Sequence, residues 1–125
     1  MALHIQTIYL EEKTAFAQNM NAMLVSKGFE VVAYDESNEQ NEIIDGVVLF
    51  HENHNFDKRV AELRDHFDKM QVAMHKIDIT GTMNVALSHL SLFFDRTKCK
   101  NVLFLGSENL KDHPKLEVFK EKWDI

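Results

Sequence analysis

A length of 125 residues matches one ordinary domain, and a composition that is 45% hydrophobic and 27% charged indicates a globular chain with a real core. The formal net charge of −6 disfavours nucleic acid as a partner, because phosphate binding depends on a surface rich in lysine and arginine. Cys99 is the only cysteine, which excludes an internal disulfide; we find neither a secretory signal nor an apolar stretch of membrane-spanning length, and therefore expect a cytoplasmic protein without a membrane partner.

The first part of the chain alternates strand-like and helix-like stretches. Residues 5–10 are rich in β-forming side chains, and a helical stripe of apolar residues follows them. Gly28 stands where a left-handed helix cap is expected, just before a second strand predicted at residues 29–34. Ser37 and Gln40 have the spacing of a capping box, which predicts a short helix before the third strand.

The second part of the chain repeats this alternation. Residues 47–50 are continuously apolar, which is the pattern of a strand covered on both faces, and an amphipathic helix follows with Asn55 as its expected N-cap. A fourth strand is predicted at residues 72–79 and, after another amphipathic helix, a fifth at residues 102–105. Pro114 then opens the last helix, because proline is favoured at the first helical position.

Five strands that are each followed by a helix predict an α/β fold with a three-layer sandwich and a five-stranded, mainly parallel sheet. We expect residues 1–125 to form a single domain of flavodoxin-like or TIR-like strand order, and 2-1-3-4-5 is the usual flavodoxin-like solution. The predicted core contains Val47, Leu49, Leu63, Phe67, Leu87, Leu90, Val102 and Phe104.

Two stretches resemble a known group of α/β proteins over roughly the first three-fifths of the chain. SKGFEVVAYDE, at the second strand, looks like the start of a TIR domain. IIDGVVLF, followed by FDKRVAELRDHF, is similar to the third strand and third helix of TIR and nucleoside 2-deoxyribosyltransferase-like proteins. In both groups a glutamate after that strand carries glycosidic-bond chemistry, and the resemblance implies that Glu62 would take that role here.

The response-regulator receiver is a further family with this order of elements. Glu11 and Glu12 imitate its acidic pair after the first strand, but His51 and Glu52 stand where its phosphoacceptor aspartate belongs. Ser107, with the glycine before it, replaces its lysine. The pattern disfavours a phosphorylatable receiver and leaves a degenerate receiver-like domain as an alternative.

Polar residues follow every predicted strand, and in a doubly wound sheet the loops after the strands share one edge, where ligands bind. The candidate ligand edge consists of Glu11, Glu12, Asp35, His51, Glu52, His54, Asp78, Thr80 and Ser107.

The candidate ligand edge contains residue types that can bind metal ions or phosphate. His51 and His54, with Asp57 or Asp78, are the metal-ligating types in the segment FHENHNFD (residues 50–57), but a loop lacks the fixed spacing of a helical ligand pair, so we predict no metal. The turn before residue 83 leads into a helix N-terminus that favours anions. It has one glycine and no lysine, so a threonine N-cap is the favoured interpretation there.

Two single residues also need an interpretation. Glu62 lies roughly 120° from the centre of its helix's apolar stripe, which predicts an exposed carboxylate on the second turn. Cys99, in RTKCK, is predicted to be an inert cysteine in a surface turn, although nearby cations would lower its pKa.

The sequence contains no nucleophile–base pair, phosphate loop or strong ligand set. We therefore expect a non-catalytic binding or signalling module that acts, without a cofactor, through a protein partner or self-association, with the fifth strand and last helix as a contact face. The alternative is an enzyme that cleaves or exchanges an N-glycosidic bond of NAD or a nucleoside through Glu62, with a nucleotide-type small molecule as ligand.

Overall fold

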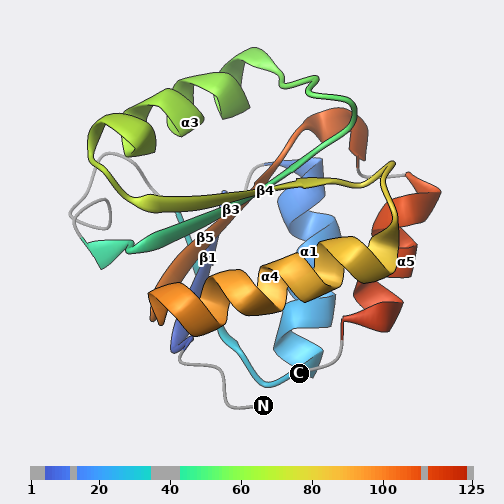
Figure 1. Cartoon of the computed structure of the whole chain (residues 1–125), viewed down its shortest axis with the longest axis horizontal. Helices are drawn as coiled ribbons and strands as arrows, with labels where there is room; N and C mark the ends of the chain where they lie inside the picture. Colours follow the sequence, from blue (N-terminus) through green and yellow to red (C-terminus); the bar gives the residue numbers. More distant parts are fainter. Residues whose placement is uncertain (1–4, 12–13, 35–42, 111–112, 124–125) are drawn as a thin grey trace.

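The computed structural model describes residues 5–11, 14–34, 43–110 and 113–123 (Figure 1). The predicted alternation of strands and helices is confirmed for these residues. In chain order the elements are β1 (Thr7–Leu10), α1 (Ala15–Ser26), β2 (Glu30–Ala33), β3 (Gly46–His51), α3 (Lys58–Lys69), β4 (Ala73–Asp78), α4 (Met83–Thr97), β5 (Asn101–Gly106), the 3-10 turn η1 (Glu108–Leu110) and α5 (Pro114–Lys122).

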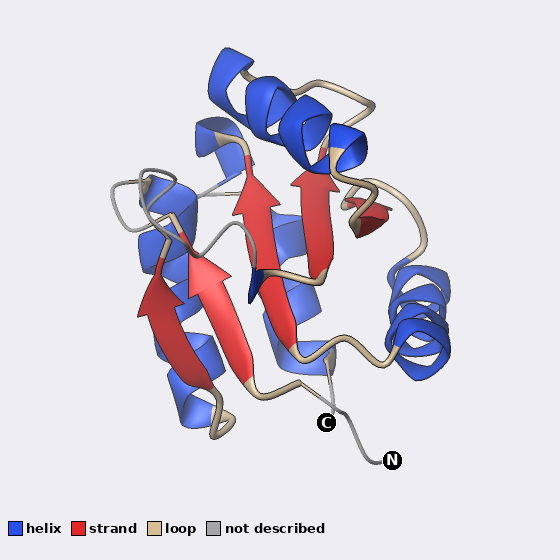
Figure 2. Cartoon of the chain, turned by 90° about the vertical axis from the view of Figure 1, so that its left-hand side faces the viewer, coloured by secondary structure: helices blue, strands red, loops and turns tan. Residues whose placement is uncertain are grey.

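The strands form one parallel sheet, and their arrows point the same way in Figure 2. This confirms the predicted fold class, a flavodoxin-like α/β sandwich. The strand order is β2-β1-β5-β3-β4, so β5 lies between β1 and β3 and not at the margin that the order 2-1-3-4-5 gives it. The apolar residues explain the difference, because β3 and β5 are buried along almost their whole length and both need neighbours on each side.

The helices cover the two faces of the sheet unequally (Figure 1). The crossovers through α1 and α4 both step toward β2 and lie on one face together with α5, whereas α3 steps the opposite way and lies on the other face. This arrangement gives the crossovers through α1, α3 and α4 the same hand, as expected for parallel strands. Two separate apolar cores result, one on each side of the sheet.

The predicted core residues are confirmed, with one difference of degree. Val102, Phe104 and Leu90 belong to the core under α1, α4 and α5, and Leu87 is only partly buried against it. The other four predicted residues lie in the core beneath α3, with Val47 and Phe67 completely buried.

The residues at the helix ends agree with two of the predicted caps and differ from a third. Gly28 has φ +89° after α1 and Pro114 opens α5, as predicted. Asn55 is not the cap of α3; the N-cap is Asp57, whose Oδ1 accepts from the Val60 N–H at 2.9 Å. The capping box of residues 37–40 lies outside the described residues.

Two expectations about the surface are wrong. Cys99 is buried, with 2% exposed, because its side chain fills the space beside Gly46. Burial raises the pKa of its thiol, so the nearby cations do not make it reactive. β5 lies inside the sheet and therefore cannot form a contact face.

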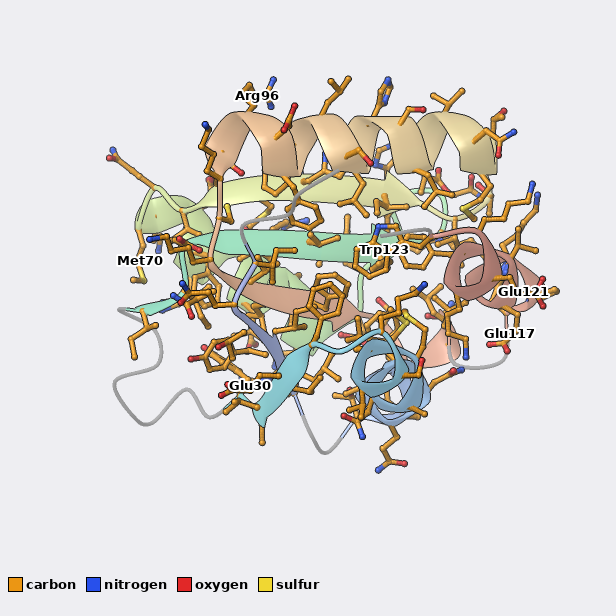
Figure 3. All side chains as sticks on the ribbon, turned by 90° about the horizontal axis from the view of Figure 1, so that it is seen from below. Glu30, Met70, Arg96, Glu117, Glu121 and Trp123 are labelled. Carbon is orange, nitrogen blue, oxygen red and sulfur yellow. The ribbon has the colours of Figure 1, made fainter. Side chains whose placement is uncertain are left out.

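The last helix, α5, also packs its apolar side chains into the core and is not available as a contact face on that side. Leu116, Phe119 and Trp123 are buried, while Glu117 and Glu121 lie on its outer side (Figure 3). Among the described residues, no helix combines the length and the apolar character needed to cross a bilayer.

Candidate functional site

The carboxyl edge of the sheet gathers most of the predicted ligand-edge residues. His51, Asp78 and Ser107 lie at or just after the ends of β3, β4 and β5, and Glu11 follows β1. The chain leaves β3 toward α3 and the neighbouring β5 toward α5, on opposite faces, and such a divergence is where ligands bind in α/β sheets. Glu12 and Asp35 lie outside the described residues.

The segment after β3 is a tight turn that the sequence did not predict. Asn53 and His54 both have positive φ, 52° and 64°, and the Asn55 N–H donates to the Glu52 carbonyl at 2.9 Å. Positive φ at both central residues is the pattern of a type I′ turn, which favours asparagine followed by glycine. Here His54 takes the position that glycine usually fills, and the turn uses Asn55 itself, which explains why Asn55 does not cap α3.

The turn places two imidazoles against each other. The rings of His51 and His54 stack with centroids 4.9 Å apart, and the His54 N–H donates to His51 Nδ1 at 3.0 Å. Phe56 packs on His51 at 5.1 Å between ring centroids, and the Arg64 guanidinium lies over Phe56 at 5.0 Å. The result is a continuous column from the turn to α3.

His51 is buried, with 2% exposed. Burial lowers its pKa below the ordinary value; Asp78 acts against this, and His54 and Lys76 add to it. Because Nδ1 accepts a hydrogen bond, the neutral ring is the form that this site stabilises. His51 is therefore a packed neutral histidine, and its Nδ1 lone pair is already used.

Asp78 and Thr80 hold the next loop. The Thr80 hydroxyl donates to Asp78 Oδ1 at 2.6 Å and the Thr80 N–H to the same atom at 3.0 Å. Burial acts to raise the pKa of Asp78, but these two bonds, and a weaker one from the Asn53 N–H, lower it overall. The charged carboxylate thus ties its own loop to the turn after β3.

A second network joins the loop after β5 to α3. Asp57 Oδ2 accepts from the Glu108 N–H at 3.2 Å, and the buried Ser107 Oγ accepts from the Asp57 N–H at 3.1 Å. Glu108 Oε1 in turn accepts from the Ala15 N–H at the start of α1, at 2.9 Å. Asp57, a candidate metal ligand in the sequence, instead ties α3 to η1.

Two further acids of the edge contact basic side chains. Glu11 Oε2 accepts from Arg59 Nη2 at 2.6 Å, which joins β1 to α3. Glu52 Oε2 lies 2.7 Å from His113 Nε2, which joins the turn after β3 to the start of α5. Among the residues that the structure describes, no three His, Cys, Asp or Glu side chains are grouped to hold a metal ion.

The carboxylate of Glu62 lies apart from these networks. Glu62 is exposed on the second turn of α3, as its helical phase predicted, and the buried side of that helix carries Val60, Leu63 and Phe67. No contact joins it to His51 or Thr80. The role that the TIR and deoxyribosyltransferase resemblance implies for Glu62 stays a prediction.

A cavity of roughly 460 Å³ adjoins the turn between β4 and α4, and sequence reasoning missed its cations. Thr82 is the N-cap of α4, but its side chain makes no capping hydrogen bond. Lys115 and Lys122 come from α5, far along the chain, so no local motif could place them here. The lining residues are Thr80, Gly81, Thr82, Met83, Asn84, Lys115, Val118 and Lys122.

Comparison with known proteins gives the fold and no sequence family. No protein-family model matches the chain, and no curated protein matches it significantly. A crystal structure described as a "putative molybdenum carrier protein" from Syntrophus aciditrophicus is similar, with a TM-score of 0.71 over 94% of this chain and 96% of that one. The two sequences are 13% identical, so this likeness shows the Rossmann-like, flavodoxin-like fold alone.

Proposed function

We propose that the protein is a non-catalytic binding or signalling module that acts through protein contacts. The observation that carries the proposal is that the acidic side chains at the carboxyl edge bind other groups of the protein. Asp57 caps α3 and binds the Glu108 N–H, Glu11 pairs with Arg59, and Asp78 binds its own loop. A catalytic acid or nucleophile needs access to a substrate, whereas these groups hold loops together.

Exposed apolar side chains on α4 support the contact part of the proposal. Val85 is 51% exposed and Leu92 is 62% exposed, and at a spacing of seven residues they share the outer face of the helix. Arg96 lies one turn beyond Leu92 on the side of α4 that points away from the sheet (Figure 3). Apolar side chains flanked by charge are common in protein interfaces.

Two measurements on the purified protein test the proposal. Incubation with NAD and with deoxynucleosides is expected to release no nicotinamide or free base above background, and turnover would overturn the non-catalytic reading. Light scattering over a range of protein concentrations is expected to show self-association that Leu92→Glu weakens. Val25→Glu is the matched control, because Val25 is 54% exposed on α1; equal effects of the two substitutions would contradict the contribution of α4.

A second candidate function, binding of a phosphate-bearing small molecule of nucleotide type, is favoured by the cavity between α4 and α5. The first turn of α4 and the ammonium groups of Lys115 and Lys122 both favour anions. Titration with inorganic pyrophosphate, followed by NMR, is expected to shift the amides of Gly81 and Asn84 saturably. The Lys115→Ala/Lys122→Ala variant is expected to lose these shifts and Lys58→Ala, in α3, to retain them; shifts that survive in the double variant would exclude the candidate.

A further inference from the structure

The outer edge of β2 has backbone groups without a strand partner among the described residues. β2 pairs only with β1 in the described sheet. The Tyr34 N–H donates to the Leu10 carbonyl at 2.6 Å, so Tyr34 and Val32 turn their N–H and C=O groups toward β1. The alternation of a parallel strand then turns the N–H and C=O groups of Val31 and Ala33 outward, where they can pair with another strand.

A cavity lies beside this edge. It measures roughly 350 Å³, within the range of ligand pockets, and it lies between β2 and α1. Apolar side chains of β1 and α1 form part of its lining, and the exposed Gln18 and Asn21 add carboxamides that can both donate and accept. The residues that line it are Leu10, Ala17, Gln18, Asn21, Val31, Val32 and Ala33.

The opposite edge strand is protected against pairing, which sets β2 apart. On β4 the Ile79 N–H donates to the His51 carbonyl, so the backbone groups of Met74, Lys76 and Asp78 are the ones that point outward. Lys76 and Asp78 are charged, and charges on an edge strand, lysine above all, discourage the addition of another strand. The outward residues of β2, Val31 and Ala33, carry no charge.

The charges around β2 indicate the chemistry of the partner. Glu30 begins the strand and lies at the margin of the sheet (Figure 3). The sequence continues beyond Tyr34 with Asp35 and Glu36, and residues 35–42 contain four acids and neither lysine nor arginine. An extended segment that lies along β2 therefore meets the negative charge of Glu30, on a chain whose formal net charge is −6. A partner with lysine or arginine at both ends of a short alternating stretch complements it.

We propose that the outer edge of β2 binds an extended, basic peptide segment of a partner protein, which adds to the sheet as a further strand. Its backbone pairs with Val31 and Ala33, and alternate side chains enter the cavity beside α1. Its lysines or arginines complement the charge of Glu30 and the net negative charge of the chain. The inference rests on the proposed function, because it names the partner class of a protein-binding module.

The test uses a fluorescein-labelled peptide of sequence KTVTVK and its charge-reversed counterpart ETVTVE, with anisotropy measured on the full chain. KTVTVK is expected to bind saturably and to shift the amides of Val31 and Ala33 in NMR spectra, and ETVTVE is expected to bind about tenfold more weakly. Ala33→Pro removes one outward N–H without removing a bond to β1, and is expected to weaken KTVTVK binding about tenfold. Met74→Pro is the matched control, because it removes an outward N–H from β4, and it is expected to leave binding unchanged.

A variant in a helix guards against misfolding of the proline variant. Asn21→Trp substitutes an exposed residue of α1 and fills the cavity, so it is expected to weaken binding by a similar factor while circular dichroism stays unchanged. The inference is overturned if KTVTVK does not bind saturably, if Asn21→Trp binds it as well as the parent does, or if Met74→Pro weakens binding as much as Ala33→Pro. Release of nicotinamide from NAD, assayed on the same samples, would overturn the non-catalytic function independently of these peptide results.

Discussion

The carboxyl ends of β3 and β5 and the outer edge of β2 use polar groups in opposite ways. At the first, side chains from distant parts of the chain satisfy one another, as when Asp57 of the loop before α3 binds the Glu108 N–H after β5. At the second, the backbone groups of Val31 and Ala33 point away from the sheet. The first region lies where the neighbouring strands β3 and β5 send their chains to opposite faces of the sheet, which is the usual place for a ligand.

The difference shows that position in the fold alone does not make a binding site. A polar group whose hydrogen bonds are made within the protein contributes to stability, and breaking it leaves its partner unsatisfied. A group that has only solvent as partner can exchange that solvent for a ligand. Substitutions at the carboxyl edge are therefore expected to change the free energy of unfolding, and substitutions at the outer edge of β2 are expected to change binding.

Proline at adjacent positions of β2 is expected to give the largest contrast in stability. The Val32 N–H faces β1, so Val32→Pro removes a ladder bond and is expected to lower the free energy of unfolding by about 3 kcal/mol. The Ala33 N–H points outward, so Ala33→Pro is expected to cost less than about 1 kcal/mol. Urea unfolding of both variants measures the contrast, and equal losses would show that the two backbone groups do not differ in direction.

At the carboxyl edge, Asp57→Ala removes the N-cap of α3 and the acceptor of the Glu108 N–H. We expect a loss of about 2 kcal/mol in the free energy of unfolding. Asp65→Ala is the control, because Asp65 is exposed on the same helix and its ion pair with Arg64 is expected to contribute less than about 0.5 kcal/mol. A loss no larger than that of the control would mean that Asp57 does not hold α3 and η1 together.

Two histidines with lowered pKa values, His51 and His75, make stability depend on pH. Burial is the main cause of the lowered pKa of His51. Burial is also the main cause for His75, and the nearby His89 and Arg96 lower its pKa further. Below the ordinary histidine pKa, near 6.5, the unfolded chain binds protons that the folded protein resists. The free energy of unfolding is therefore expected to be largest above that pH. It is expected to fall as the pH drops toward the pKa values that the two histidines have in the folded protein.

Urea unfolding at several values between about pH 8 and pH 5 measures this slope. His51→Gln is expected to reduce it, and His51→Gln/His75→Gln is expected to reduce it further. His66→Gln is the control, since His66 is exposed on α3. Stability that rises on acidification, or a slope that is unchanged in the double variant, would contradict the neutral state of the buried His51 ring and the partly buried His75 ring.

The sequence predicted the elements well because their signals are local. Apolar runs identified β3 and β5, and Gly28 and Pro114 marked helix ends through backbone preferences that act within one turn. The strand order was missed because the lengths of the connections do not encode it. In retrospect, two strands without any polar face favour the interior of the sheet, so the two apolar runs carried part of that information.

The candidate site was predicted in place but not in detail. His51, Asp78 and Ser107 meet at the predicted edge because parallel strands end there together. The type I′ turn was missed because its sequence signal is asparagine followed by glycine, and here His54 follows Asn53. Lys115 and Lys122 were missed because only tertiary packing brings α5 beside the start of α4.

Glu62→Ala is expected to have the smallest effect, because Glu62 belongs neither to the satisfied edge nor to the open edge of β2. It is exposed on α3, and alanine is at least as good a helix former, so the free energy of unfolding is expected to stay within about 0.5 kcal/mol of the parent value. Binding of KTVTVK is also expected to be unchanged, since α3 covers the opposite face of the sheet from α1. Urea unfolding, anisotropy and the NAD assay on this variant measure the three properties together. Nicotinamide release that is present in the parent and lost in Glu62→Ala would show that an exposed carboxylate on the second turn of α3 performs glycosidic chemistry, and would favour the enzyme over the binding module.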